Sequence, residues 1–355
     1  MVRTASRMTT ALAFLAGALA IPVVASAQNF TVQKYDIKGD GGTDYLTAES
    51  GTGRVFVSRG THVMVVDGLT GKVLGDIPDT PRMHGIALAM KDGHGFTTNG
   101  GDSTSTMFDL KDFHVIQKVH AGTNGLDGIM YDDFSDKVLT INHSSPEGSA
   151  VVIDAKSGDV VGKVTLSGTP EGGVSDGKGK IFINIESKNA IDVVDAKTWT
   201  KIATWDIAPC DGPTGIAMDR KTNRIFSGCS GTSVVVDATT GKVVAQIPNG
   251  TGVDALGFDK NEKLIYIPAG QGDGSVTVVH EDSPDKYTVV ATVPTVKGAK
   301  TIAVDDVKHM AFLFQPEYGP APAPDPNAPA PAAGRGRGRG PRGPMVAGWF
   351  IAIKH

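Results

Sequence analysis

The chain of 355 residues contains 45 glycines and only 6% aromatic residues, a composition that suits short strands joined by many tight turns. Its length allows one large domain or two ordinary ones. The net charge of −4 becomes −6, with 32 basic against 38 acidic residues, once the two arginines of positions 1–27 are set aside. This acidic balance argues against a main surface that wraps duplex nucleic acid.

The segment 1–27 is typical of a cleavable export signal. Arg3 and Arg7 form a positive start, residues 11–24 are apolar but too few to span a bilayer, and Ala25-Ser26-Ala27 matches a cleavage site. We therefore expect a mature chain of residues 28–355 that is periplasmic or secreted. No later segment is an apolar run long enough to span a bilayer, so we expect no transmembrane segment in the mature chain.

An apolar run ending in aspartate then returns at a nearly constant interval along the chain. Its aspartates are Asp67, Asp109, Asp154, Asp195 and Asp237, spaced by 42, 45, 41 and 42 residues. A period of about 40–50 residues with several short strands per unit is typical of β-propeller blades. Seven small-residue first strands, suited to a crowded central channel, predict seven four-stranded blades; they are expected at residues 44–47, 85–88, 128–131, 172–175, 215–218, 255–258 and 301–304.

The N-terminus of the mature chain is expected to close the ring of blades. Only six outer strands follow a third strand, and the third strand of the last blade, at residues 348–353, is followed by the end of the sequence. The β-type run Phe30 to Ile37 therefore supplies the missing outer strand. The recurring aspartates precede hairpin turns such as Asp154-Ala155-Lys156-Ser157-Gly158, so we interpret them as turn residues rather than catalytic acids.

The repeats resemble the YVTN-type repeats of exported bacterial seven-bladed propellers, often called YncE-like. The resemblance lies in a Gly-Ile-Ala first strand, a second strand of the Ile-Phe type and a Val-Val-Val-Asp third strand followed by an Ala-x-Thr-Gly-Lys turn. These features stand at Gly215-Ile216-Ala217, Arg224-Ile225-Phe226 and residues 234–242. The resemblance implies the propeller fold over nearly the whole mature chain. It implies no single activity, because related propellers include lactonases, other enzyme domains and binding modules.

Residues 316–344 form an insertion between the second and third strands of the last blade. It begins with alternating proline and alanine and ends in Arg335-Gly336-Arg337-Gly338-Arg339-Gly340. Such a composition cannot bury a core, so we expect a disordered segment. It is interpreted either as a spacer or as a cationic arm for an anionic partner.

Loops that enter the first strands place one residue per blade at the mouth of the channel. These residues are Asp44, His84, Asp127, Glu171, Thr214, Asp254 and Lys300. Because their spacing follows the blade period, we expect a ring. The ring can hold a divalent cation through oxygen ligands or a cationic or polyhydroxylated ligand, or it is an ordinary polar channel rim.

A second set of loops, between second and third strands, faces the same end of the propeller. It adds Arg59, His62, Asn99, Asp102, Asn142, His143, Glu186, Asn189, Gln271 and Asp273. If His62, His84 and His143 approach one another, they suit a transition metal. No His-x-His or cysteine-containing spacing supports that site, and the familiar hydrolase, kinase and zincin motifs are absent from the sequence.

The two cysteines, Cys210 and Cys229, are expected on the same face of one blade. In an oxidising compartment such a pair is predicted to form a disulfide. A redox or copper site is the alternative interpretation.

The sequence thus predicts an exported propeller that acts as a binding or scaffold protein. Its ligand, a small molecule or a protein, would be recognised at the channel mouth. The alternative is a metal-dependent hydrolase of the lactonase-like type, in which a cation at the mouth polarises an ester carbonyl. Bound metal would favour the alternative, and a metal-free protein with a tight organic or macromolecular partner would favour the first.

Overall fold

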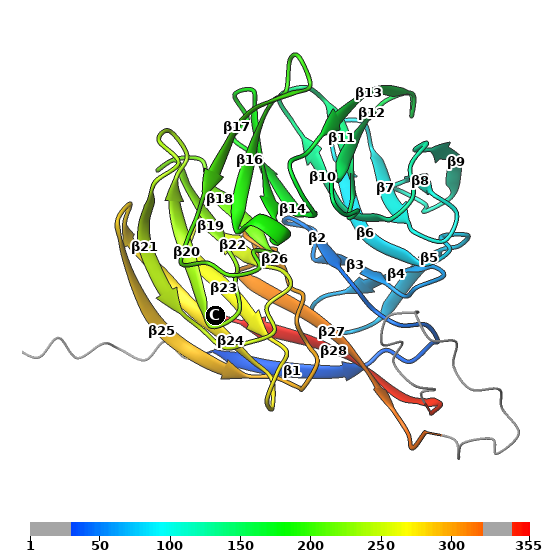
Figure 1. The fold of residues 1–355 in the computed structure, drawn as a ribbon. Helices are drawn as coiled ribbons and strands as arrows, with labels where there is room; N and C mark the ends of the chain where they lie inside the picture. Colours follow the sequence, from blue (N-terminus) through cyan, green and yellow to red (C-terminus); the bar gives the residue numbers. More distant parts are fainter. Residues whose placement is uncertain (1–29, 322–342) are drawn as a thin grey trace, which may run out of the picture.

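The computed structural model describes residues 30–321 and 343–355 and contains seven four-stranded antiparallel sheets arranged around a central axis (Figure 1). This confirms the predicted seven-bladed β-propeller. Blades 1 to 4 consist of β2 (Leu46–Glu49), β3 (Arg54–Ser58), β4 (Val63–Asp67) and β5 (Val73–Ile77); β6 (Met83–Ala89), β7 (His94–Asn99), β8 (Thr104–Asp109) and β9 (Val115–His120); β10 (Leu126–Asp132), β11 (Lys137–Asn142), β12 (Ser149–Asp154) and β13 (Val160–Thr165); and β14 (Pro170–Ser175), β15 (Lys180–Ile185), β16 (Ala190–Asp195) and β17 (Thr200–Asp206).

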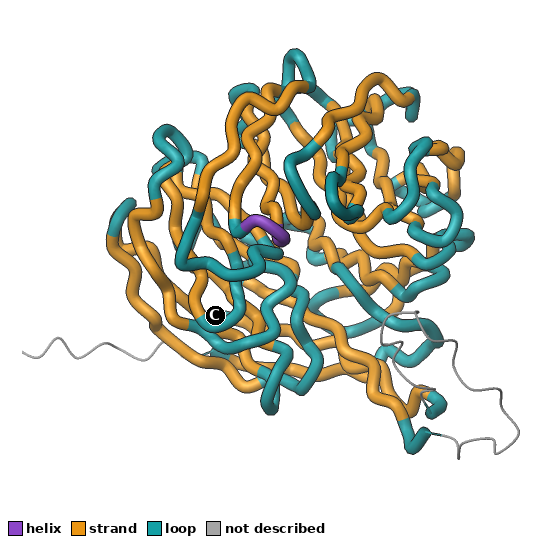
Figure 2. Tube along the Cα trace, viewed as in Figure 1, coloured by secondary structure: helices purple, strands orange, loops and turns teal. Residues whose placement is uncertain are grey.

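Blades 5 to 7 complete the ring. They consist of β18 (Ile216–Asp219), β19 (Arg224–Ser227), β20 (Thr232–Asp237) and β21 (Val243–Pro248); β22 (Gly257–Asp259), β23 (Leu264–Ala269), β24 (Ser275–Ser283) and β25 (Lys286–Pro294); and β26 (Ala303–Asp305), β27 (Met310–Tyr318), β28 (Met345–Lys354) and β1 (Thr31–Asp36). The only helix of the described residues is the short 3-10 turn η1 (Glu186–Lys188), purple in Figure 2. No helix in this part of the chain is long and apolar enough to cross a membrane.

The N-terminal strand closes the last blade, as the sequence predicts. β1 pairs with β28 in antiparallel register from Thr31 opposite Lys354 to Asp36 opposite Trp349, and the two lie side by side in Figure 1. The ring of Tyr35 packs near that of Phe350 at 6.5 Å between centroids. The outer edge of β28 is therefore covered along its length, which removes an exposed edge strand.

Neighbouring blades are held together by apolar side chains of their second and third strands. Phe56 of blade 1 and Phe108 of blade 2, both fully buried, lie 5.9 Å apart between ring centroids. Burying a phenylalanine contributes about 2 kcal/mol, and every gap between blades is filled in this way by one of the apolar clusters. This packing fixes the position of each first strand around the channel.

The first strands of blades 1, 6 and 7 begin later than the sequence predicts. They start at Leu46, Gly257 and Ala303, two residues after the predicted starts at positions 44, 255 and 301. The residues before them make loop contacts instead: the amide of Asp44, for example, donates to Ser58 Oγ at 2.7 Å. The channel-mouth residues of these blades are consequently held by loops.

The recurring aspartates hold hairpin turns, as predicted. Asp154 Oδ1 accepts hydrogen bonds from the amides of Lys156 and Ser157 at 3.0 and 2.8 Å. These contacts lower the pKa of Asp154, with the Ser157 amide the largest cause. The side chain is thus engaged within its own turn.

The insertion of the last blade is bounded by a long hairpin. The insertion begins later than the predicted position 316, since Pro316, Glu317 and Tyr318 continue β27 and pair with Gly348, Ala347 and Met345. They remain in the strand because β28 offers them partners along this length. Positions 319–321 and 343–344 of the predicted segment are also described, and the amide of Gly319 donates to the backbone oxygen of Pro344 at 2.8 Å. Positions 322–342 and the predicted export signal lie outside the described residues.

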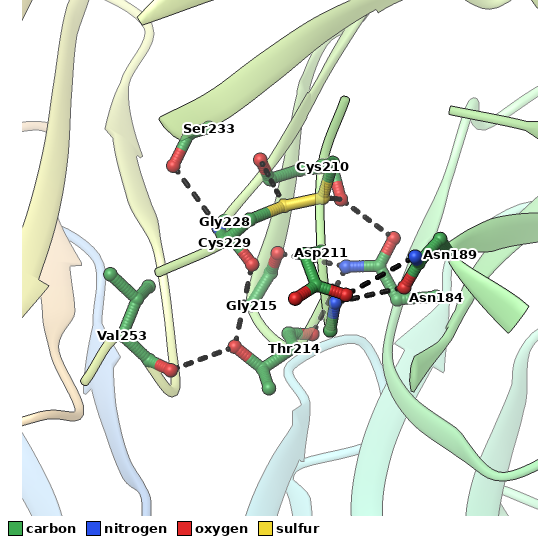
Figure 3. The surroundings of a disulfide bond; sticks show 12 residues. Asn184, Asn189, Cys210, Asp211, Thr214, Gly215, Gly228, Cys229, Ser233 and Val253 are labelled. Atoms are coloured by element: carbon green, nitrogen blue, oxygen red, sulfur yellow. Dashed lines mark hydrogen bonds between the residues drawn. A yellow bond between two sulfur atoms is a disulfide. The ribbon is translucent and has the colours of Figure 1, made fainter. Parts of the chain in front are cut away.

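The two cysteines form a disulfide, as predicted, within blade 5 (Figure 3). Their Cα atoms are 5.6 Å apart, and both side chains are buried in an apolar cluster that includes Phe182 of blade 4. The disulfide ties the loop entering blade 5 to the end of β19. Because disulfides persist in oxidising compartments, it indicates a location outside the reducing cytoplasm.

We expect no free thiol when the protein is denatured without reductant and alkylated. Both thiols should react after reduction. The Cys210→Ser, Cys229→Ser double variant should lose about 3 kcal/mol of unfolding free energy, because the bond closes a loop of some 20 residues. Urea unfolding measures that loss. Two thiols that alkylate without reduction would contradict the assignment.

Candidate functional site

Three neighbouring blades present a polar side chain from a β-bulge at the channel mouth. In β6 the register shifts between Met83 and Ile86, in β10 between Leu126 and Ile129, and in β14 between Pro170 and Gly173. Within these shifts lie His84, Asp127 and Glu171, each followed by glycine. A bulge adds a residue to one strand and re-aims its side chain, so all three are turned to the same mouth.

The bulge glycines let these blades approach closely. A Cβ on Gly128 would lie 2.7 Å from the backbone oxygen of Glu171, and one on Gly172 would lie 2.9 Å from the backbone oxygen of Thr214. Any larger residue would therefore push one blade away from the next. The spacing between the carboxylates of Asp127 and Glu171 depends on this contact.

A polar cavity of about 240 Å³, open to solvent, lies at the mouth. Its lining residues are Asp44, Tyr45, Asp127, His143, Glu171, Glu186, Asp254 and Lys300. Five of the seven predicted ring residues are among them. A sixth, His84, contacts two of these five, since its Nδ1 lies 2.6 Å from Asp44 Oδ2 and 3.5 Å from Asp127 Oδ1.

On the other side of Asp127, His143 bridges two glutamates. Its Nδ1 lies 2.8 Å from Glu171 Oε1 and its Nε2 lies 3.8 Å from Glu186 Oε2. His143 follows β11 and Glu186 begins η1, so both come from loops between second and third strands. These loops meet the bulges, as their predicted common face requires.

The cavity carries excess negative charge. Burial, followed by the charge of Glu171, raises the pKa of Asp127 to about 6. Burial also raises the pKa of Asp254 and of Glu186. Contact with Glu171 raises the pKa of His143 to about 9. Carboxylates crowded in this way favour a cation among them.

Tyr45 is a site residue that the sequence reasoning did not identify. Its hydroxyl donates to Glu171 Oε2 at 3.2 Å, across the mouth from blade 1 to blade 4. Burial, followed by the charge of Glu171, raises its pKa well above the ordinary value. Tyr45 also lines a glycine-rich channel cavity of about 200 Å³, so it lies between the channel and the acidic cavity.

Two predicted ring residues make internal contacts. The Thr214 hydroxyl donates to the backbone oxygen of Val253 at 3.1 Å, a bond drawn in Figure 3, and does not line the acidic cavity. Lys300 forms an ion pair with Asp254. Thr214 therefore acts as a link between blades 5 and 6.

Of the three histidines that would suit a transition metal if they converged, His62 lies apart from the other two. His84 and His143 flank Asp127, whereas the Nε2 of His62 lies 3.5 Å from Oδ2 of Asp76 in the outer strand β5. The reason is its place immediately before β4, whose residue Met64 pairs with Asp76. Arg59 is also directed away, being fully buried and donating to the backbone oxygen of Lys38 at 2.8 Å.

Comparison with known proteins supports the fold and leaves the activity open. No family model matches the chain. The sequence is similar to the uncharacterized protein YncE of Salmonella typhi and to YncE of Salmonella typhimurium strain LT2, at 21% identity over 185 residues in each case. Each match covers 50% of this chain and 52% of the relative, so the chain spans about half the length of the curated relatives it matches. With the seven blades, this confirms the resemblance to YncE-like propellers.

Solved structures that are similar to this chain come from unrelated contexts. They include Kuenenia stuttgartiensis hydrazine synthase (TM-score 0.68, 15% identity, 78% of this chain and 93% of that one). A chain of the mitotic checkpoint complex has a TM-score of 0.69 and 16% identity, and the match covers 86% of this chain and 95% of that one. U3-55K has a TM-score of 0.71 and 9% identity, and the match covers 91% of this chain and 98% of that one. At these identities the similarity shows the fold alone.

A separate buried carboxyl lies at the opposite end of the blades. Glu281 of β24 is 1% exposed, and the Thr222 hydroxyl lies 2.9 Å from its Oε1 and 3.0 Å from Asp219 Oδ2. Burial raises the pKa of Glu281 to about 7; Thr222 and Lys263 oppose the shift and the charge of Asp219 adds to it. The Tyr287 hydroxyl lies 3.5 Å from the same oxygen.

This raised pKa predicts a loss of stability with rising pH. The native state favours protonated Glu281, so its contribution is complete below the ordinary pKa of 4.5 and disappears as pH rises through about 7. The difference in unfolding free energy between Glu281→Gln and the unaltered protein, measured by urea unfolding, should therefore shift in favour of the variant by about 2 kcal/mol from pH 5 to pH 8.5. The control Asp195→Asn removes a turn carboxylate with a lowered pKa. It should lower the unfolding free energy by the same amount at both pH values. An equal effect of Glu281→Gln at both pH values would contradict the assignment.

Proposed function

We propose that this protein is an exported binding protein whose channel-mouth cavity takes a cationic ligand. The observation that carries the proposal is the state of Asp127. Its Oδ1 atom is buried and accepts no hydrogen bond from the described residues, although Asp44, Glu171 and their histidines surround it. A buried carboxylate oxygen without a donor is costly unless a cation or a donor from a ligand completes it.

The charge and shape of the surroundings support this function. Five carboxylates line the cavity with Lys300 and His143. A second cavity of about 330 Å³ adjoins it and shares Asp44 and Lys300. The rest of its lining is rich in glycine and includes Gln271 and Gln315, so it leaves room for a polar ligand beside the cation.

Export is supported by two independent features. The disulfide between Cys210 and Cys229 suits an oxidising compartment. The segment 1–27 has the charge pattern of an export signal. A periplasmic or secreted location follows from the two together.

Thermal melts with a panel of cations test the binding function. The probes are Zn²⁺, Mn²⁺, Ca²⁺ and spermidine, and at least one should raise the melting temperature of the unaltered protein. A probe present at 100 times its dissociation constant stabilises by about 2.7 kcal/mol. Asp127→Asn with Glu171→Gln should abolish that rise. The same variant without a probe should be as stable as the unaltered protein or slightly more stable, because like charges no longer repel.

The matched control removes two carboxylates from turns far from the mouth. Asp154→Asn with Asp237→Asn should lose turn stability and keep the rise. No rise with any probe, or a rise that survives in the mouth variant, would contradict the proposal. Hydrolysis of a lactone by the unaltered protein and not by the mouth variant would instead support the lactonase-like alternative.

A further inference from the structure

We propose that the channel-mouth cavity is a two-metal site in which Asp127 bridges two transition-metal ions. This inference rests on the proposed function, because it specifies the cation that the same cavity takes. It follows from three observations: the grouping of the ligand atoms, the buried oxygen of Asp127 that accepts no hydrogen bond from the described residues, and the presence of two imidazoles.

The ligand atoms fall into two groups of three. The first group is Asp44, His84 and Asp127, and the second is Asp127, His143 and Glu171; within each, one ligand atom per residue lies within 4.8 Å of the other two. Ligands on opposite sides of a first-row ion are about 4 Å apart, since each bond is about 2.1 Å. Each group can therefore close around one ion with small side-chain movements.

Asp127 belongs to both groups. A carboxylate has two oxygens and can ligate one ion with each. Oδ1 of Asp127 is buried without a hydrogen bond from the described residues, and its nearest cationic contact is His84 at 3.5 Å. Nδ1 of His143 is likewise buried, and its partner is Oε1 of Glu171 at 2.8 Å, a carboxylate of the same group. In the first group, Nδ1 of His84 is paired with Oδ2 of Asp44 at 2.6 Å, so Oδ1 of Asp127 is the carboxylate oxygen of the two groups that is buried without a donor among the described residues.

The donor set favours transition metals over calcium. Each group supplies one imidazole with two carboxylates, and imidazole suits zinc, iron, copper and nickel, whereas calcium takes six to eight oxygens. His84 is held in a ligating orientation. A Cβ on Gly100 would lie 2.9 Å from His84 Nε2, so Nε2 packs against that backbone while Nδ1 faces Asp44 and Asp127.

A third group of potential ligands provides an internal control. Asp109, Asp112 and His114 lie on the outer hairpin of blade 2. The side chains of His114 and Asp112 are 59% and 64% exposed. No buried atom there lacks a partner among the described residues, so we expect no tight ion at this hairpin.

The test counts zinc ions bound by the full, untagged chain after treatment with a chelator. Native mass spectrometry gives the stoichiometry, and calorimetry in competition with a chelator gives the affinities. The unaltered protein and His114→Gln should each bind two ions. His84→Gln and His143→Gln should each bind one, because each removes the only imidazole of one group. Asp127→Asn should weaken both ions at least tenfold, with melting temperatures confirming that each variant is folded.

The outcomes separate this inference from the proposed function. A single zinc ion in the unaltered protein, or loss of all zinc in both histidine variants, would overturn the two-metal site. If zinc does not bind while calcium or spermidine still raises the melting temperature, the inference fails and the proposed function stands. If none of the probes binds, both fail. Should Asp127→Asn not fold, the stoichiometries of the two histidine variants still decide.

Discussion

Deleting residues 30–37 should leave a protein that is largely unfolded and aggregates. The deletion removes β1, so the backbone donors and acceptors of β28 lose their partners from Trp349 to Lys354. It also removes Ile37, which is 6% exposed, and the aromatic contacts that Phe30 makes with Tyr266 and Tyr35 with Phe350. At about 2 kcal/mol for each large apolar side chain, the loss is about 5 kcal/mol or more, comparable to the whole stability of an ordinary domain.

A rearranged chain supplies the matched control for this deletion. Because Thr31 lies opposite Lys354, near the end of the sequence, residues 30–37 can be attached after His355 through a short Asn-Gly turn. This variant rebuilds β1 as a hairpin with β28 and should recover most of the lost stability. Thermal melts and light scattering compare the three proteins. A deletion variant that melts within a degree or two of the intact protein would contradict the role of β1.

The fold could be predicted because the regular spacing of the apolar strands indicates the repeat. The interval between Asp67 and Asp109 and its successors defined the blades, and the lack of an outer strand after residues 348–353 pointed to Phe30 to Ile37. Both inferences rely on local strand patterns that each blade repeats. Strand starts were less predictable, since Asp44 and its counterparts in blades 6 and 7 are held by loop contacts.

The location of the site could be predicted from the sequence, but most of the contacts among its residues could not. The blade period placed Asp127 and Glu171 at the mouth, but the bulges that turn them toward each other depend on the registers of β10 and β14. Tyr45 is distinguishable in the sequence, because it is a large aromatic directly after the ring residue Asp44, where the other blades carry Gly, Ala or Thr. His62 does not join the other two histidines, because the pairing between β4 and β5 places it beside Asp76. The loop sequence does not reveal this pairing.

Gly128→Ala should disrupt the acidic cavity without touching any of its side chains. The new Cβ would meet the backbone oxygen of Glu171 at 2.7 Å, and a backbone atom can yield only if blade 3 moves away from blade 4. Such overpacking costs about 1–3 kcal/mol. It also separates Asp127 and His143 of blade 3 from Glu171 of blade 4, so binding of zinc by the second group should weaken at least tenfold, as it does when supporting contacts of metal ligands are lost.

Gly42→Ala is the control for Gly128→Ala, because a Cβ at Gly42 meets no atom within 4 Å and the residue borders the adjoining cavity. It should leave both the melting temperature and zinc binding unchanged. Gly172→Ala extends the series: its Cβ would meet the Thr214 backbone oxygen at 2.9 Å, on the far side of Glu171. It should therefore lower stability as Gly128→Ala does. It should also weaken binding of the second ion more than binding of the first ion, which Asp44 and His84 hold. If Gly128→Ala melts and binds zinc like Gly42→Ala, close contact between blades 3 and 4 does not set the geometry of the site.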